Sequence, residues 1–135
     1  MAGTLQFDLV SPEKRLASMT ATEVLIPGTE GDLTAMEGHA PVIVSLRTGT
    51  LRVCNVDGHV TSFVVTGGFA EITGSTVSVL AERVIPFEEA TGKVIDAILA
   101  EARSLAAAAL PEDKDMADKN VADALAVHDA ILKAH

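Results

Sequence analysis

Few residues of this sequence combine a reactive type with the spacing that catalysis or metal binding needs. The four histidines, His39, His59, His128 and His135, are far apart, and no cysteine cluster joins them at metal-ligand spacing. The single cysteine, Cys54, excludes an internal disulfide and is typical of a small core residue. We therefore expect no metal site and no bound cofactor.

Glycine-rich segments give no phosphate-binding site or nucleophile motif. Gly92-Lys93 matches part of a phosphate-binding loop, but that loop needs glycine at position 87 and serine or threonine at 94, where this chain has Phe87 and Val94. Gly67-Gly68 lies between two predicted strands and indicates a turn or bulge. No Gly-x-Ser-x-Gly motif occurs. We expect no catalytic residue and rank an enzyme last among the function classes.

Composition narrows the classes of partner. The formal net charge of -9 disfavours nucleic acid and the anionic membrane surface, and an aromatic content of 3% gives few stacking platforms. No apolar run approaches the ~20 residues that span a bilayer, and the first residues lack the basic start and apolar block of a signal peptide. We expect a cytosolic chain with no nucleic-acid partner and no direct lipid anchor.

Residues 1–86 have the pattern of many short strands separated by glycine turns. Apolar residues alternate with polar ones, and Asp57-Gly58 indicates a type I′ hairpin turn. The expected strand segments are Leu5–Leu9, Thr22–Ile26, Leu51–Asn55, Ser62–Val65, Phe69–Ile72 and Val77–Ala81. This spacing predicts an N-terminal antiparallel β-sandwich or flattened barrel.

Residues 87–135 form a second predicted domain, an antiparallel αα-hairpin. Two helices of about 22 residues each are expected, the first with Glu88 and Glu89 at its positive end and the second beginning at Pro111. Their apolar stripes are Val94, Ile95, Ile98, Leu99, Ala102, Leu105, Ala106 and Ala109, then Ala117, Val121, Ala124, Leu125, His128, Ile131 and Leu132. Alanine-rich faces bury little area, so the hairpin must lean on the sandwich, on a partner, or alternately on both.

Five short motifs occur in the order of one known family. They are Leu9-Val-Ser-Pro-Glu13, Ile26-Pro-Gly-Thr-Glu-Gly-Asp32, Gly38-His-Ala-Pro41, Val65-Thr-Gly-Gly-Phe-Ala-Glu71 and Val79-Leu-Ala-Glu82. Together they resemble the epsilon subunit of the bacterial ATP synthase. The resemblance is strong from Leu5 to Glu82, and after Pro86 only the helical-hairpin architecture matches.

The resemblance implies a non-catalytic rotor subunit of a proton-translocating ATP synthase. Such a subunit binds the gamma subunit in the central stalk, sits on the membrane c-ring and couples proton-driven rotation to ATP synthesis. In many bacteria the hairpin also reaches the alpha and beta subunits of the catalytic head and restrains ATP hydrolysis. The implied location is peripheral, on the cytoplasmic face of the bacterial plasma membrane, and the absence of a recognisable transit peptide favours a bacterial subunit.

The resemblance also assigns two contact surfaces. Glu30, Gly31 and Asp32 match the turn that faces the polar loops of the c-ring. The residues that match the segment lying against gamma are His39, Ala40, Pro41, Val42, Ile43 and Val44. The residues alone leave simpler alternatives open, a solvated turn for the first surface and a core strand for the Val42–Val44 part of the second.

The C-terminal region departs from the family in two ways. Many relatives bind ATP through Ile/Leu-Asp-x-x-Arg-Ala, whereas this chain keeps Ile95, Asp96 and Ala100 but has Leu99 in place of the arginine. Shifting the frame by four residues recovers Arg103 but loses the aspartate. The second helix is also acidic, so repulsion from acidic surfaces of the catalytic head should make hydrolysis inhibition weak.

The residues by themselves leave a second class open, a free-standing acidic β-sandwich binding module with a helical dimerisation tail. Self-association through the hairpin would favour this module, and a heteromeric partner would favour the rotor subunit. The scarcity of aromatic residues already argues against glycan binding.

ATP binding by the isolated chain is expected to be weak or absent. Arginine pairs with phosphate oxygens through two parallel hydrogen bonds, and leucine at position 99 has neither the charge nor the donors. Titration calorimetry with ATP checks this prediction. Binding in the micromolar range or tighter would contradict it.

Overall fold

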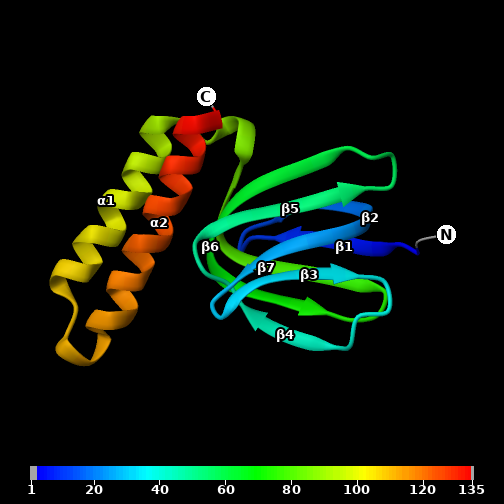
Figure 1. Ribbon diagram of the computed structural model, residues 1–135, viewed down its shortest axis with the longest axis horizontal. Helices are drawn as coiled ribbons and strands as arrows, with labels where there is room; N and C mark the ends of the chain where they lie inside the picture. The colour runs from blue at the N-terminus through cyan, green and yellow to red at the C-terminus, as the bar shows by residue number, and fades with distance from the viewer. Residues whose placement is uncertain (1–2, 135) are drawn as a thin grey trace.

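The computed structural model describes residues 3–134, which form a β-sandwich followed by a helical hairpin (Figure 1). The strands are β1 (Leu5–Val10), β2 (Arg15–Gly28), β3 (Gly31–Met36), β4 (Val42–Ser45), β5 (Gly49–Asn55), β6 (Val60–Ile72) and β7 (Thr76–Pro86). The helices are α1 (Gly92–Ala108) and α2 (Lys114–Ala134), preceded by the short 3₁₀ turns Phe87–Glu89 and Pro111–Asp113.

The strands close on themselves as a flattened barrel. Hydrogen-bonded neighbours run β1-β7-β6-β5-β2, and β2 also pairs with β1, while β3 flanks β2 and β4 flanks β6. β1 and β7 are parallel and every other pair is antiparallel. The predicted sandwich with a C-terminal helical hairpin is confirmed, with this one parallel pair as an addition.

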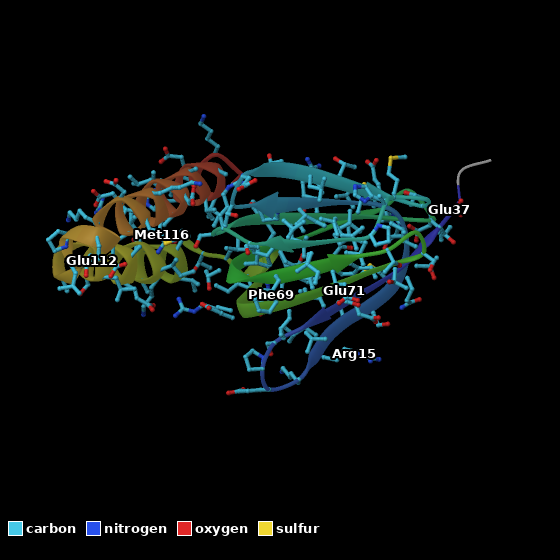
Figure 2. All side chains as sticks on the ribbon, turned by 90° about the horizontal axis from the view of Figure 1, so that it is seen from below. Arg15, Glu37, Phe69, Glu71, Glu112 and Met116 are labelled. Carbon is cyan, nitrogen blue, oxygen red and sulfur yellow. The ribbon has the colours of Figure 1, made fainter. Side chains whose placement is uncertain are left out.

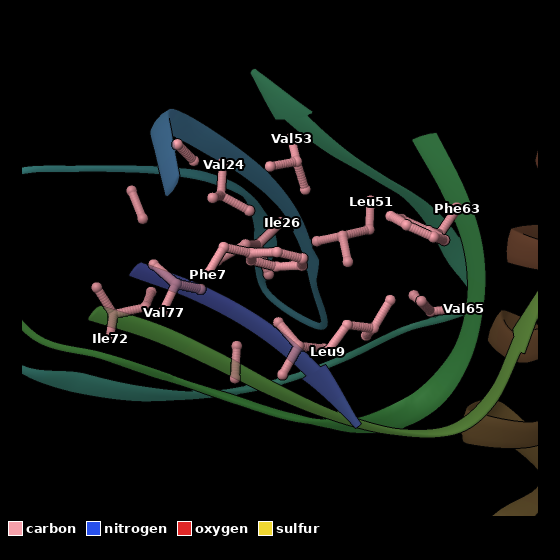
Figure 3. Packing of buried hydrophobic residues seen from close by; sticks show 14 of the residues in the cluster. Phe7, Leu9, Val24, Ile26, Leu51, Val53, Phe63, Val65, Ile72 and Val77 are labelled. Carbon is pink, nitrogen blue, oxygen red and sulfur yellow. The ribbon is translucent and has the colours of Figure 1, made fainter. Parts of the chain in front are cut away.

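Alternation of apolar and polar residues places the sandwich core between the two layers. Leu5, Phe7 and Leu9 of β1 are fully buried, as the sequence pattern predicts, and Leu51 and Val53 of β5 face them from the other layer (Figure 3). Phe7 is the largest of the fully buried side chains. Aliphatic residues supply nearly all the rest, so packing of Val, Leu and Ile carries the hydrophobic stabilisation.

β6 belongs to both layers because it bends at two glycines. Its first half pairs with β5 and its second half with β4, while β7 runs alongside throughout. Gly67 and Gly68 have φ of 68° and 106°, and the register with β7 does not shift across them. The predicted turn or bulge is therefore a bend within one continuous strand, since a bulge would shift the register.

Three local expectations were wrong. Only Gly58 has positive φ in the β5–β6 connection, which excludes a type I′ turn because that turn needs positive φ at both central residues. β2 begins at Arg15 rather than Thr22, since its first half pairs with β1 although its side chains are largely exposed. α1 begins at Gly92 and has 17 residues, because the hydroxyl of Thr91 caps it by accepting a hydrogen bond from the Val94 amide.

The helical hairpin packs against the outside of the sandwich over β5, β6 and β7, where a second core forms. Val64 is buried beneath the hairpin, whereas its neighbours Phe63 and Val65 face the sandwich core. The buried helical residues are Ile95, Ile98, Leu99, Ala102 and Ala106 of α1 and Ala124, Val127 and Ile131 of α2. Val127 is absent from the predicted stripe, and Leu105 and Leu132 of that stripe are exposed.

Gly68→Ala is expected to destabilise the fold by about 2–4 kcal/mol, through strain at positive φ and overpacking. A Cβ at Gly68 would collide with the carbonyl oxygen of Leu80 and lie 2.9 Å from the Cα of Ala81. Gly74→Ala is the matched control, because the nearest atom to its added Cβ is 3.8 Å away. Urea unfolding of both variants gives the comparison, and equal losses would contradict the prediction.

Candidate functional site

A contiguous group of apolar side chains is exposed on the outer face of β1, β4, β6 and β7. We call Val10, Ile43, Phe69 and Leu80 the apolar patch. Ile43 is 70% exposed and Phe69 is 52% exposed. Strand register brings Leu80 opposite both Phe69 and Val10, and Phe69 lies near Glu71 along β6 (Figure 2). Exposed apolar side chains that gather in this way mark an interaction surface.

The residues matched to the gamma contact lie beside the apolar patch, in the β3–β4 connection and in β4. Ala40 and Pro41 are exposed, and the Nδ1 atom of His39 is 2.7 Å from the carbonyl oxygen of Ala40. Val42 is exposed, but Val44 packs against the sandwich core. Ile43 is therefore the residue that β4 directs toward solvent on this face.

Sequence reasoning missed three members of the apolar patch. It placed Phe69 in an expected strand after the Gly67-Gly68 turn and left Val10 and Leu80 without a role. The available signal was the strand alternation, because Leu80 stands between the buried residues Val79 and Ala81 at a position where a polar side chain is expected.

The matched c-ring turn, Glu30-Gly31-Asp32, connects β2 to β3 at the end of the sandwich nearest the helices (Figure 1). Glu30 and Asp32 are exposed, and Gly31 has φ of 131°, a conformation that favours glycine. β3 separates this turn from His39, Ala40 and Pro41 of the other matched surface. β4 then runs back toward the turn, because the Thr29 amide donates to the Ser45 carbonyl at 2.9 Å.

A belt of polar contacts joins the hairpin to the sandwich around the second core. Lys119 donates to the Thr29 carbonyl at 2.6 Å, and the Thr48 hydroxyl donates to Asn120 at 3.2 Å. On the α1 side, Arg83 pairs with Glu101 at 2.8 Å. These contacts add directional polar links to the apolar packing of the second core.

Asp123 of α2 has a raised pKa, and it lies at this junction. Burial raises the pKa of its carboxyl group, while the nearby Arg47 and Lys119 act in the opposite direction without cancelling the effect. The Arg47 Nε is 4.0 Å from the carboxylate of Asp123. Ionisation of Asp123 therefore lowers the stability of the docked hairpin.

Two other groups with shifted pKa values lie outside these surfaces. Burial, with an added contribution from Glu23, raises the pKa of the Cys54 thiol, which keeps the thiol protonated and unreactive. A hydrogen bond from the His59 backbone amide lowers the pKa of the exposed Asp57 in the β5–β6 connection.

Within residues 3–134, no three His, Cys, Asp or Glu side chains gather as a metal site. None of the helices in this described part of the chain is long and apolar enough to cross a membrane.

Comparison with known proteins decides the family. Residues 4–87 match the family model described as the β-sandwich domain of the ATP synthase delta/epsilon chain. The ATP synthase epsilon chain of Cereibacter sphaeroides is 61% identical over 94% of this chain and 96% of its own length. The Sinorhizobium medicae epsilon chain is 36% identical over 99% of this chain and 100% of its own. The chain belongs to the family of ATP synthase epsilon chains.

Solved structures support the fold of this epsilon chain. A chain of the Euglena gracilis mitochondrial ATP synthase superposes with a TM-score of 0.71 at 21% identity, covering 97% of this chain and 81% of that one. A chain in the Tetrahymena thermophila structure, described as central stalk and c-ring, gives 0.51 at 20% identity, covering 65% and 70%.

At the position compared with the ATP motif, apolar packing and a side-chain hydrogen bond hold the residues. Ile95 and Leu99 are buried in the second core, so residue 99 faces neighbouring apolar side chains rather than solvent. Asp96 is exposed and lies 3.1 Å from the Nε2 of His128 on α2. This epsilon chain thus uses its motif aspartate to join the two helices, while Ala100 is exposed.

Docking of the hairpin is expected to weaken as pH rises through the raised pKa of Asp123, from about the ordinary value of 3.8 upward. Protonated Asp123 carries no charge into its partly buried position, so its contribution to stability is complete at low pH and is lost as the carboxyl group ionises. Asp123→Asn stays neutral, so its stability relative to the unsubstituted chain should increase between pH 3 and 7. Urea unfolding of both proteins across this range measures the difference between their free energies of unfolding. The other carboxylates are the same in both proteins, so their effects cancel. A constant or decreasing difference would contradict the assignment.

Proposed function

We propose that this epsilon chain is a non-catalytic rotor subunit that links the gamma subunit to the membrane c-ring and couples proton-driven rotation to ATP synthesis. The observation that carries the proposal is the apolar patch, which includes Ile43 of the segment matched to gamma. A rotor subunit needs two separate surfaces, one for each partner, and no reactive centre.

The apolar patch suits gamma as its occupant. Ile43, Phe69 and Leu80 offer an uncharged centre, and Glu71 at its border offers a rim charge. Stable interfaces have this arrangement of an apolar core within a polar rim. Gamma is the partner that the resemblance implies, and relatives named as ATP synthase epsilon chains that cover almost the whole sequence support association with that enzyme.

The Glu30–Asp32 turn suits the c-ring as its occupant. Its two carboxylates are exposed at the end of a strand, which favours contact with a polar loop that carries basic side chains. The Tetrahymena neighbour comes from a structure described as central stalk and c-ring. We place this chain on the cytoplasmic face of the bacterial plasma membrane, held peripherally by protein contacts.

Residues 87–135 form a proposed second domain with a regulatory role that we expect to be weak. The hairpin docks through a small cluster of Ile, Leu, Val and Ala side chains and a few polar contacts, and elements held by few contacts can open locally. Contact with the alpha and beta subunits would need an extended hairpin. The acidic α2 would then meet repulsion from acidic surfaces on the catalytic head.

Phe69→Ser is expected to weaken binding to the isolated gamma subunit at least tenfold, because it removes a large apolar side chain from the centre of the proposed interface. Surface plasmon resonance with immobilised gamma measures the affinity. Phe69 is already half exposed, so the free energy of unfolding should change little.

Leu132→Ser is the matched control, since Leu132 is an apolar residue of α2 with a similar exposure of 56%. It should leave gamma binding unchanged. Equal affinities for the Phe69 and Leu132 variants would contradict the assignment of the apolar patch to gamma.

A further inference from the structure

The segment Leu46–Thr48, between β4 and β5, touches both the c-ring turn and the hairpin. Leu46 forms a bridge with Gly28, and the Arg47 amide donates to the Pro27 carbonyl at 3.0 Å. On the other side, Thr48 is buried and donates to Asn120 of α2 at 3.2 Å. The backbone of Arg47 is thereby fixed between the two elements.

The guanidinium group of Arg47 serves carboxylates of both elements. Its Nη2 donates to Asp32 at 2.5 Å and its Nη1 to the Gly28 carbonyl at 2.7 Å, while its Nε lies 4.0 Å from Asp123. Asp32 is 56% exposed at its side chain and Asp123 is 19% exposed. One partly buried cation is thus shared by an exposed carboxylate on the turn and a partly buried one on the hairpin.

We propose that Arg47 couples the c-ring turn to the hairpin, so that a positively charged loop pairing with Asp32 favours the docked hairpin. The inference rests on the proposed contact between this turn and the c-ring. It adds a regulation that the contact alone does not imply.

The sign of the coupling follows from the competition for one cation. A basic side chain that pairs with Asp32 leaves Arg47 free to move toward Asp123, whose burial makes a close counter-charge more valuable. Coupling between two binding events is reciprocal, so the docked hairpin also leaves Asp32 more available to the basic loop.

Lys119 acts in the same direction. Its ammonium group holds the Thr29 carbonyl at 2.6 Å only while α2 is docked, which orders the turn that carries Asp32. An extended hairpin would lose this contact and leave Arg47 to neutralise Asp32 alone.

Hydrogen exchange of the full-length isolated chain tests the coupling, with Asp32→Asn imitating the neutralised turn. The opening equilibrium of α2 should fall about two- to fivefold, the range for a partly exposed ion pair. Glu30→Gln is the matched control, because it removes the same charge from the same turn while Glu30 makes no ion pair within residues 3–134. It should leave the opening unchanged.

Arg47→Gln, alone and combined with Asp32→Asn, completes a double-mutant cycle. It should increase the opening of α2, and in this background Asp32→Asn should have no further effect. Protected amides of β5 report whether each variant keeps its sandwich.

The coupling would be overturned if Asp32→Asn left the opening of α2 unchanged, or if it had the same effect in the Arg47→Gln background. It would also be overturned if the amides of α2 exchanged only when the whole sandwich unfolds. The exchange experiment uses the isolated chain without the c-ring. If the chain failed to bind the c-ring in a separate experiment, the proposed function would be contradicted, but the measured coupling between Asp32 and the hairpin would remain.

Discussion

The bend of β6 at Gly67 and Gly68 is the constraint on which the rest of the structure depends. It lets one strand pair with β5 in its first half and β4 in its second. Phe63 and Val65 fill the sandwich core, Val64 supports the hairpin, and beyond the bend Phe69 faces solvent. A side chain at Gly68 would collide with β7, so the close approach of two backbones fixes core, hairpin and apolar patch together.

The two domains differ in how firmly they are held. The sandwich core is the larger of the two clusters, whereas the hairpin rests on a smaller cluster of Ile, Leu, Val and Ala side chains and on a belt of polar contacts. Charged groups at the junction act in both directions, because Arg47 and Lys119 make contacts that join the domains, while the raised pKa of Asp123 shows that its ionised form opposes docking. This imbalance makes the hairpin the part best suited to respond to partners.

Sequence patterns predicted the fold well where alternation was strict, as in Leu5, Phe7 and Leu9. They failed where tertiary contacts decide the outcome. The first half of β2 is a strand because β1 pairs with it, and the Thr91 cap rather than Glu88 sets the start of α1. The motifs indicated the family, which the comparisons confirm. They also indicated two candidate surfaces, and these stay predictions. Phe69 and Leu80 join the patch only through cross-strand register, and Arg47 meets Asp123 only across domains, so neither grouping has a local signature.

The central claim is that this chain joins the rotor through gamma, chiefly by apolar contact. Titration calorimetry of the full-length chain with isolated gamma at low and high salt tests it most directly. The account predicts one-to-one, sub-micromolar binding that weakens only slightly with salt, since screening acts on charges and little on apolar burial. Absence of binding, with a monodisperse homodimer in its place, would contradict the account and favour a free-standing module.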